Sequence, residues 1–125
     1  MDGLHLTADL HGCDTTLAVM HEPTALRALC MRSVEQAGLQ PVGELFHRFP
    51  DAGGVTGVVL LAESHLAVHT WPELSAVTLD VYVCNFGGDN TARAERLFAA
   101  LTSAFAPASV RRQALRRGAL GEMAG

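Results

Sequence analysis

Lysine is missing from this 125-residue sequence, in which all nine Lys-or-Arg positions are arginine. Enzymes that use pyridoxal phosphate need a lysine to hold their cofactor as a Schiff base. P-loop proteins need a lysine to bind phosphate. The absence of lysine therefore excludes both of these classes.

Long basic tracts, long apolar runs and paired cysteines are also missing. No basic tract exceeds two arginines and the formal net charge is -4, so nucleic-acid binding has no electrostatic support. No apolar run approaches the roughly 20 residues of a membrane span. The first residues lack the charged and apolar regions of a signal peptide. The 3 cysteines form no CxxC pair, which favours a reduced, cytoplasmic setting over a disulfide scaffold.

The patterns that are present predict one α+β domain. A hydrophobic content of 49% suits a single domain with a real core. Alternating and continuous apolar patterns predict strands, and helical spacing predicts two helices. The expected strands cover 3–10, 41–49, 55–62, 77–84 and 109–117, and the expected helices cover 22–37 and 91–105.

We expect these elements to form a two-layer α/β sandwich, a mostly antiparallel sheet with two helices on one face. The continuous apolar strand at 55–62 predicts burial on both of its faces. Apolar residues are also expected on the sheet face that the helices leave open. We therefore expect two sheets to pair face to face in a dimer.

The segment AESHLAVHTWPE, at 62–73, places many polar side chains directly after the apolar run GVVLL. A buried polar group must find a hydrogen-bond partner or it costs stability. The segment is therefore either an exposed turn or a place where chemistry occurs.

Single residues of this region leave alternatives open. The spacing of His65 and His69 would suit a metal in a helix, but no third ligand stands at a suitable spacing. Ser64 is a turn serine or a nucleophile, although it lacks the GxSxG elbow of hydrolases. Cys84, considered alone, is best explained as a small, buried, hydrophobic residue. Asp80, on the same face of that strand, is harder to explain because aspartate is disfavoured in strands.

Taken together, GGVTGVVLLAESHLAVHTWPE at 53–73 and LDVYVC at 79–84 strongly resemble the bacterial S-adenosylmethionine decarboxylase proenzymes. These are the short, self-processing members of that family, which depend on a pyruvoyl group. The similarity extends to FHRF at 46–49 and to ADLHGCD at 8–14. It covers roughly residues 5–105, most of the chain.

The resemblance implies that the single domain, 1–125, is made as an inactive precursor that cuts itself between Glu63 and Ser64. The products would be a β chain, 1–63, and an α chain, 64–125, which begins with a pyruvoyl group made from Ser64. That group would take the substrate amine as a Schiff base and serve as the electron sink. The reaction would then need no lysine, no pyridoxal phosphate and no metal.

The resemblance also implies the roles of the site residues. His69 would transfer a proton during processing, and Cys84 would give a proton to the substrate carbon after carbon dioxide leaves. Glu73 would hold the ribose hydroxyls and Phe49 would stack on the adenine. The substrate-binding set comprises Phe49, His65, Trp71 and Glu73.

The implied partners are a small-molecule substrate, the two chains of one precursor and a second αβ unit in a homodimer. Neither nucleic acid nor a membrane is among them. The substrate would be S-adenosylmethionine, and its product would be the aminopropyl donor for spermidine biosynthesis.

The sequence departs from the family pattern beside the substrate-binding set. Leu74-Ser75-Ala76 stands where many relatives have Tyr-Gly-Tyr, and Asn85 stands where the cysteine is usually followed by glycine. The first change motivates an alternative, a pyruvoyl-dependent arginine or ornithine decarboxylase. A third reading is a non-catalytic homologue that acts as a regulatory partner, although the complete set of Glu-Ser-His, His and Cys argues against it.

Overall fold

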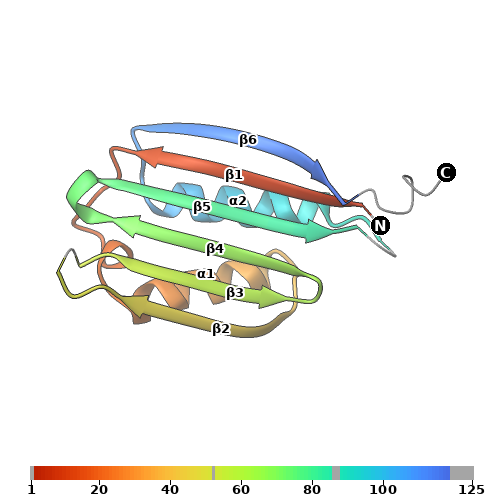
Figure 1. Cartoon of the computed structure of the whole chain (residues 1–125), viewed down its shortest axis with the longest axis horizontal. Coiled ribbons are helices and arrows are strands. Elements are labelled where there is room, and N and C mark those ends of the chain that lie inside the picture. The colour runs from red at the N-terminus through yellow and green to blue at the C-terminus, as the bar shows by residue number, and fades with distance from the viewer. Residues whose placement is uncertain (1, 52, 86–87, 119–125) are drawn as a thin grey trace.

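Six antiparallel strands form one sheet, in the order β2-β3-β4-β5-β1-β6 (Figure 1). The computed structural model describes residues 2–51, 53–85 and 88–118. The strands are β1 (Gly3–His11), β2 (Pro41–Arg48), β3 (Val55–Leu61), β4 (Ser64–Trp71), β5 (Ala76–Cys84) and β6 (Ser109–Arg117). The first strand of the chain thus lies between the last two.

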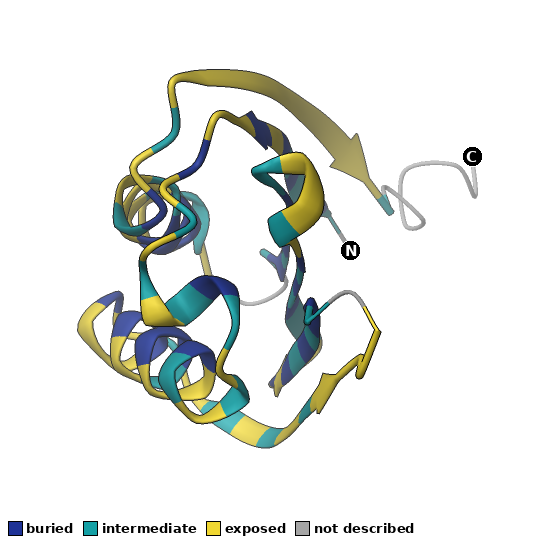
Figure 2. Cartoon of the chain, turned by 90° about the vertical axis from the view of Figure 1, so that its left-hand side faces the viewer, coloured by how far each residue is buried: buried dark blue, intermediate teal, exposed yellow. Residues whose placement is uncertain are grey.

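Two helices cover one face of this sheet and leave the other face open (Figures 1 and 2). They are α1 (Pro23–Gln36) and α2 (Thr91–Ala104), and two short 3-10 helices accompany them, η1 (Ala18–Met20) and η2 (Pro72–Leu74). Helix α1 begins with a proline, whose missing N–H costs nothing at that position. Gly38 follows its end with φ of +82°, a conformation that glycine adopts without a steric penalty.

The apolar stripes that the sequence predicted on both helices lie in the core. Every member is at most 7% exposed: Leu26, Leu29, Cys30, Val34, Ala37, Ala94, Leu97, Phe98, Leu101 and Phe105. These side chains pack against alternate residues of the strands, because successive side chains of a strand point to opposite faces. The predicted α+β architecture, with two helices on one face of an antiparallel sheet, is confirmed.

Most of the polar segment forms a strand, β4, which pairs with β3 on one side and β5 on the other. The expected burial of 55–62 on both faces is wrong for the single chain. The helices cover only one face, so Val55 and Val59 are buried while Leu60, on the open face, is 50% exposed.

Large apolar side chains are exposed on the open face of the sheet. They come from four strands: Leu45, Leu60, Trp71 and Leu115. This uncovered apolar surface agrees with the reason for expecting a dimer, which stays a prediction. Within the described part of the chain, no helix has the length and apolar character needed to cross a membrane.

Candidate functional site

The predicted cleavage bond lies in the tight turn between β3 and β4. Leu61 pairs with Ser64, so only Ala62 and Glu63 connect the two strands. The Ser64 hydroxyl oxygen accepts a hydrogen bond from the backbone N–H of Cys84, over 3.1 Å. The end of β5 thus brings the predicted proton donor beside the predicted cleavage serine, and Cys84 is 7% exposed.

His65 lies next to this corner, within a group of polar and aromatic side chains on the open face. Its ring stacks on Tyr82, with 5.6 Å between the centroids, and His5 lies 6.3 Å away on the other side of the group. Partial burial lowers the pKa of His65, proximity to His5 lowers it further, and the Asp80 carboxylate partly opposes both effects. The lowered pKa favours the neutral imidazole near pH 7, a form that can accept a proton.

The structure also accounts for Asp80, the strand aspartate that the sequence left unexplained. Its Oδ1 lies 3.5 Å from Nε2 of His5. Arg117 Nη1 lies 3.1 Å from Nδ1 of the same ring. Because a guanidinium can only donate hydrogen bonds, His5 accepts through Nδ1 and its proton is on Nε2, facing the carboxylate. Asp80 therefore lies beside the Nε2–H of a neutral His5 ring, on the open face of the sheet.

A second group of predicted residues lies at the far end of β4. A small cavity of about 90 Å³ gathers Phe49, His69, Trp71 and Glu73, together with Gly54, Thr56 and Thr70. The loop after β2, the strands β3 and β4, and η2 bring these side chains together. Three members of the predicted substrate-binding set, Phe49, Trp71 and Glu73, therefore lie beside His69.

Thr56 is a member of this site that the sequence analysis missed. Its hydroxyl lies 2.9 Å from Nδ1 of His69, within hydrogen-bond distance. The bond fixes the ring and occupies Nδ1, so any proton transfer by His69 would use Nε2. The signal that could have found Thr56 is the pairing of β3 with β4, which sets these two residues opposite each other.

The two groups are far apart in one chain. One contains Glu63, Ser64, His65 and Cys84, and the other contains Phe49, His69, Trp71 and Glu73. Ser64 and His69 are five residues apart on the same strand, which corresponds to about 17 Å at 3.3–3.4 Å per residue. A single copy of the chain therefore does not bring His69 to the serine on which it is expected to act.

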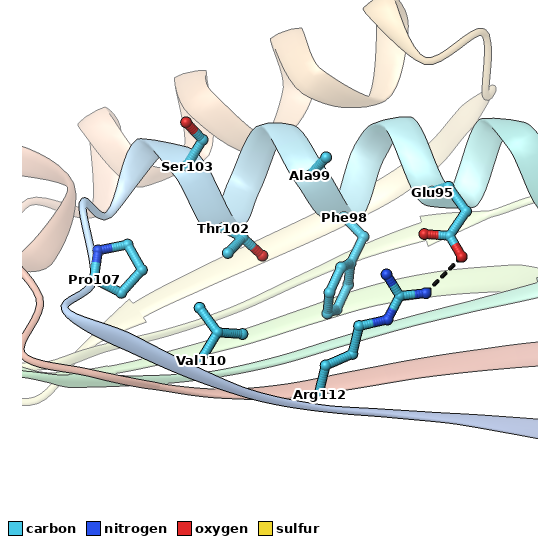
Figure 3. A pocket seen from close by; sticks show the side chains of 8 residues that line it. All are labelled: Glu95, Phe98, Ala99, Thr102, Ser103, Pro107, Val110 and Arg112. Carbon is cyan, nitrogen blue, oxygen red and sulfur yellow. Dashed lines mark hydrogen bonds and ion pairs between the residues drawn. The ribbon is translucent and has the colours of Figure 1, made fainter.

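Larger hollows lie outside these groups. One of about 340 Å³ adjoins the second group through Trp71 and includes Leu74, where the sequence departs from the family pattern. Another of about 390 Å³ lies between α2 and β6 and is mainly apolar (Figure 3). At its edge Arg112 forms an ion pair with Glu95 and lies over the ring of Phe98. That hollow contains none of the predicted site residues.

The spacing of His65 and His69 raised the possibility of a metal site. They lie on the same face of β4, at positions that pair with different residues of β5. Over residues 2–51, 53–85 and 88–118, no three or more His, Cys, Asp or Glu side chains are grouped so that they could hold a metal ion.

Comparison with known proteins identifies the family. The model of the S-adenosylmethionine decarboxylase family matches residues 4–118. An S-adenosylmethionine decarboxylase proenzyme of Archaeoglobus fulgidus is 39% identical over 116 residues, which are 93% of this chain and 97% of that protein. The proenzyme of Thermoplasma acidophilum is 37% identical over 98% of this chain and 88% of its own length.

A solved structure shows the same fold. The crystal structure of the adenosylmethionine decarboxylase from Aquifex aeolicus superposes with a TM-score of 0.82 at 35% identity. The superposition covers 93% of this chain and 90% of that one. The chain belongs to the S-adenosylmethionine decarboxylase family, as the motifs predicted. The arginine or ornithine alternative has no support among these relatives, all of which are named for S-adenosylmethionine.

Proposed function

We propose that the protein is a proenzyme that cuts itself between Glu63 and Ser64 and then decarboxylates S-adenosylmethionine. The observation that supports this proposal most directly is the 3.1 Å hydrogen bond from the backbone N–H of Cys84 to the Ser64 hydroxyl. Ser64 and Cys84 lie at one corner of the sheet, which supports their proposed roles as cleavage serine and proton donor. Membership of the family supports the reaction and the substrate.

The self-cleavage that we propose needs no external reagent except water. The Ser64 hydroxyl attacks the carbonyl carbon of Glu63, the C–N bond breaks, and the hydroxyl proton passes to the released nitrogen. Loss of the Ser64 Cα proton to a base then breaks the new ester, giving a carboxylate at Glu63 and a dehydroalanine. Water hydrolyses the dehydroalanine to a pyruvoyl group and ammonia. The two-residue turn exposes this peptide bond, since Ala62 and Glu63 are both exposed.

The corner of the sheet fits the group that would form there. Once formed, the pyruvoyl group supplies the carbonyl that takes up the substrate amine and the electron sink that decarboxylation requires. The Cys84 thiol would hold the proton for the substrate carbon, and its side chain is nearly excluded from water. The neutral His65 ring, stacked on Tyr82, would form a wall of the same corner.

A homodimer would unite the two separated groups of residues. A two-fold axis that runs across the strands, between two facing sheets, would lay β4 of one protomer antiparallel over β4 of the other. The Ser64 end of one strand would then meet the His69 end of its partner. A cavity of about 90 Å³ is small for a nucleoside, since ligand pockets usually measure about 300–1,000 Å³. A second protomer would complete it.

Within that composite site, the second group would bind the nucleoside. The Glu73 carboxylate would accept hydrogen bonds from the ribose hydroxyls. The Phe49 ring, 48% exposed in the single chain, would gain a partner by stacking on the adenine. Thr56 would keep the His69 ring oriented for proton transfer.

The decisive experiment is a denaturing gel with mass spectrometry of the purified protein. We expect two pieces, 1–63 and 64–125, whose summed mass equals that of the precursor plus water minus ammonia. Ser64→Ala removes the attacking hydroxyl and should leave one intact chain. Ser103→Ala, on the exposed surface of α2, is the matched control and should be cut like the wild type.

An unmodified serine at the new terminus would mean simple proteolysis, and an uncut wild-type chain would contradict the proposal. Carbon dioxide release should follow addition of S-adenosylmethionine to the cut protein. Arginine and ornithine serve as comparison substrates in the same assay and should release none.

A further inference from the structure

The residue before the cleavage bond has a strained backbone. Glu63 has φ of +55°, in the left-handed region that side chains other than glycine, asparagine and aspartate seldom enter. Two-residue hairpin turns normally place glycine or asparagine at such a position. Here the turn consists of Ala62 and Glu63, so the sequence places an unfavourable residue next to the bond that must break.

The fold holds this strained conformation in place. Leu61 and Leu66, on either side of the turn, are 4% and 0% exposed, so the core fixes both strands. Strand pairing joins Leu61 to Ser64, and Cys84 anchors the serine hydroxyl. The Glu63 residue itself is exposed. The surrounding structure therefore holds the backbone of this residue, and not its side chain, in the strained conformation.

Self-cleavage would relieve this strain at each stage. Before the reaction the path from the Glu63 carbonyl carbon to the Ser64 Cα passes through one atom, the amide nitrogen. In the ester it passes through two atoms, Oγ and Cβ. The turn becomes longer by one atom, and Glu63 can return to negative φ. After elimination the residue ends the chain and is no longer constrained by the turn.

We propose that the left-handed conformation of Glu63 is a built-in driving element for self-cleavage, so that Glu63 acts as a positioning residue through its backbone. This inference rests on the proposed self-cleavage. Strain raises a rate to the extent that it is relieved in the transition state. The carboxylate of Glu63 has no part in this effect, which depends only on how well residue 63 tolerates positive φ.

The test is a series of substitutions at residue 63, with cleavage timed on freshly translated precursor. Glu63→Gly adopts positive φ without strain, and we expect it to cut about fivefold more slowly, equivalent to about 1 kcal/mol. Glu63→Asn should lie between glycine and the wild type. Glu63→Gln keeps the shape and the strain but removes the charge, so it should not share the slowing of Glu63→Gly.

Stability provides a second readout with the opposite sign. In the uncleavable Ser64→Ala background, Glu63→Gly should raise the midpoint of thermal unfolding by roughly 3 to 5 °C. The matched control is Ala106→Gly, at another left-handed residue, with φ of +47°, remote from the cleavage bond. It should stabilise the fold likewise and leave the rate of cleavage unchanged.

Two results would overturn the inference. One is a Glu63→Gly precursor that is more stable and yet cuts as fast as the wild type. The other is a Glu63→Gln precursor that is slowed as much as Glu63→Gly, which would assign the effect to the carboxylate. Failure of the wild type to cut at all would instead refute the proposed self-cleavage, so the two ideas fail separately.

Discussion

At the scale of single residues, Cys84 has two competing explanations. It is nearly buried, as a structural cysteine would be, and its backbone contacts the hydroxyl of Ser64. If its thiol gives a proton during decarboxylation, Cys84→Ala should still cut itself. Its turnover per pyruvoyl group should fall by about 100-fold or more, the usual contribution of a positioned acid.

Cys30→Ala is the control for loss of a buried thiol. Cys30 lies on α1 with 0% exposure, and burial raises its pKa to about 12. Its removal should lower the free energy of unfolding and leave turnover unchanged. Wild-type turnover in Cys84→Ala would remove Cys84 from the chemistry and leave it as part of the core.

His65 gives a prediction about pH at the same scale. Its pKa is lowered from 6.5 by burial, then by His5, against the opposing effect of Asp80. The unfolded chain therefore binds this proton more readily than the folded chain. The free energy of unfolding should decrease as pH falls below about 6.5, and His65 should contribute nothing to the pH dependence well above it.

Replacing the ring tests this sign. Urea unfolding at pH 7, 6 and 5 should show a smaller loss of stability for His65→Gln than for the parent, both in the Ser64→Ala background so that one chain is present. His47→Gln, on the exposed surface of β2, controls for the loss of one histidine. Identical pH dependence in parent and His65→Gln would show that the proton on His65 is not linked to folding.

At the scale of elements, local patterns predicted the helices and most strands because each follows its own periodicity. The apolar stripe of α2 and the alternation of β5 are read without knowing what they pack against. Strand β4 was harder, since its many polar residues lie on an open sheet face that a single sequence does not identify. The same open face explains why the apolar run in β3 did not indicate burial on both sides.

The candidate site depends on pairings that no local pattern contains. Thr56 meets His69 only because β3 and β4 adopt one register, and the two residues are 13 positions apart. The placement of β1 between β5 and β6 is likewise set by long-range pairing. The eight predicted site residues came from the family resemblance. Family motifs contain residues that strand pairing brings together, although no local pattern shows the pairing. The resemblance did not reveal that they fall into two groups.

At the scale of the whole molecule, the two groups predict that processing acts between protomers. In a mixed dimer of Ser64→Ala and His69→Ala chains, the His69→Ala chain keeps its serine and faces an intact His69. Coexpression in equal amounts should therefore cut up to about half of the His69→Ala chains, by random pairing. Each variant alone should remain uncut, and tags of different length distinguish the chains on a gel.

Light scattering on the same sample is the accompanying control. A dimeric mass with no cut chains would show that the His69 of one protomer does not serve the other. A monomeric mass at micromolar concentration would contradict the dimer itself.

The order of the strands has a consequence for what the proposed cut does to the protein. The piece 1–63 would supply β1, β2 and β3, and the piece 64–125 would supply β4, β5 and β6. In the sheet these strands interleave, because β1 pairs on both sides with strands of the other piece. The intact precursor folds as one chain, whereas the cut protein, once unfolded, could reassemble only by an encounter of two molecules. The cut enzyme would therefore keep a fold that formed while the two pieces were still one chain. Once unfolded, it would refold poorly, so each molecule would mature only once.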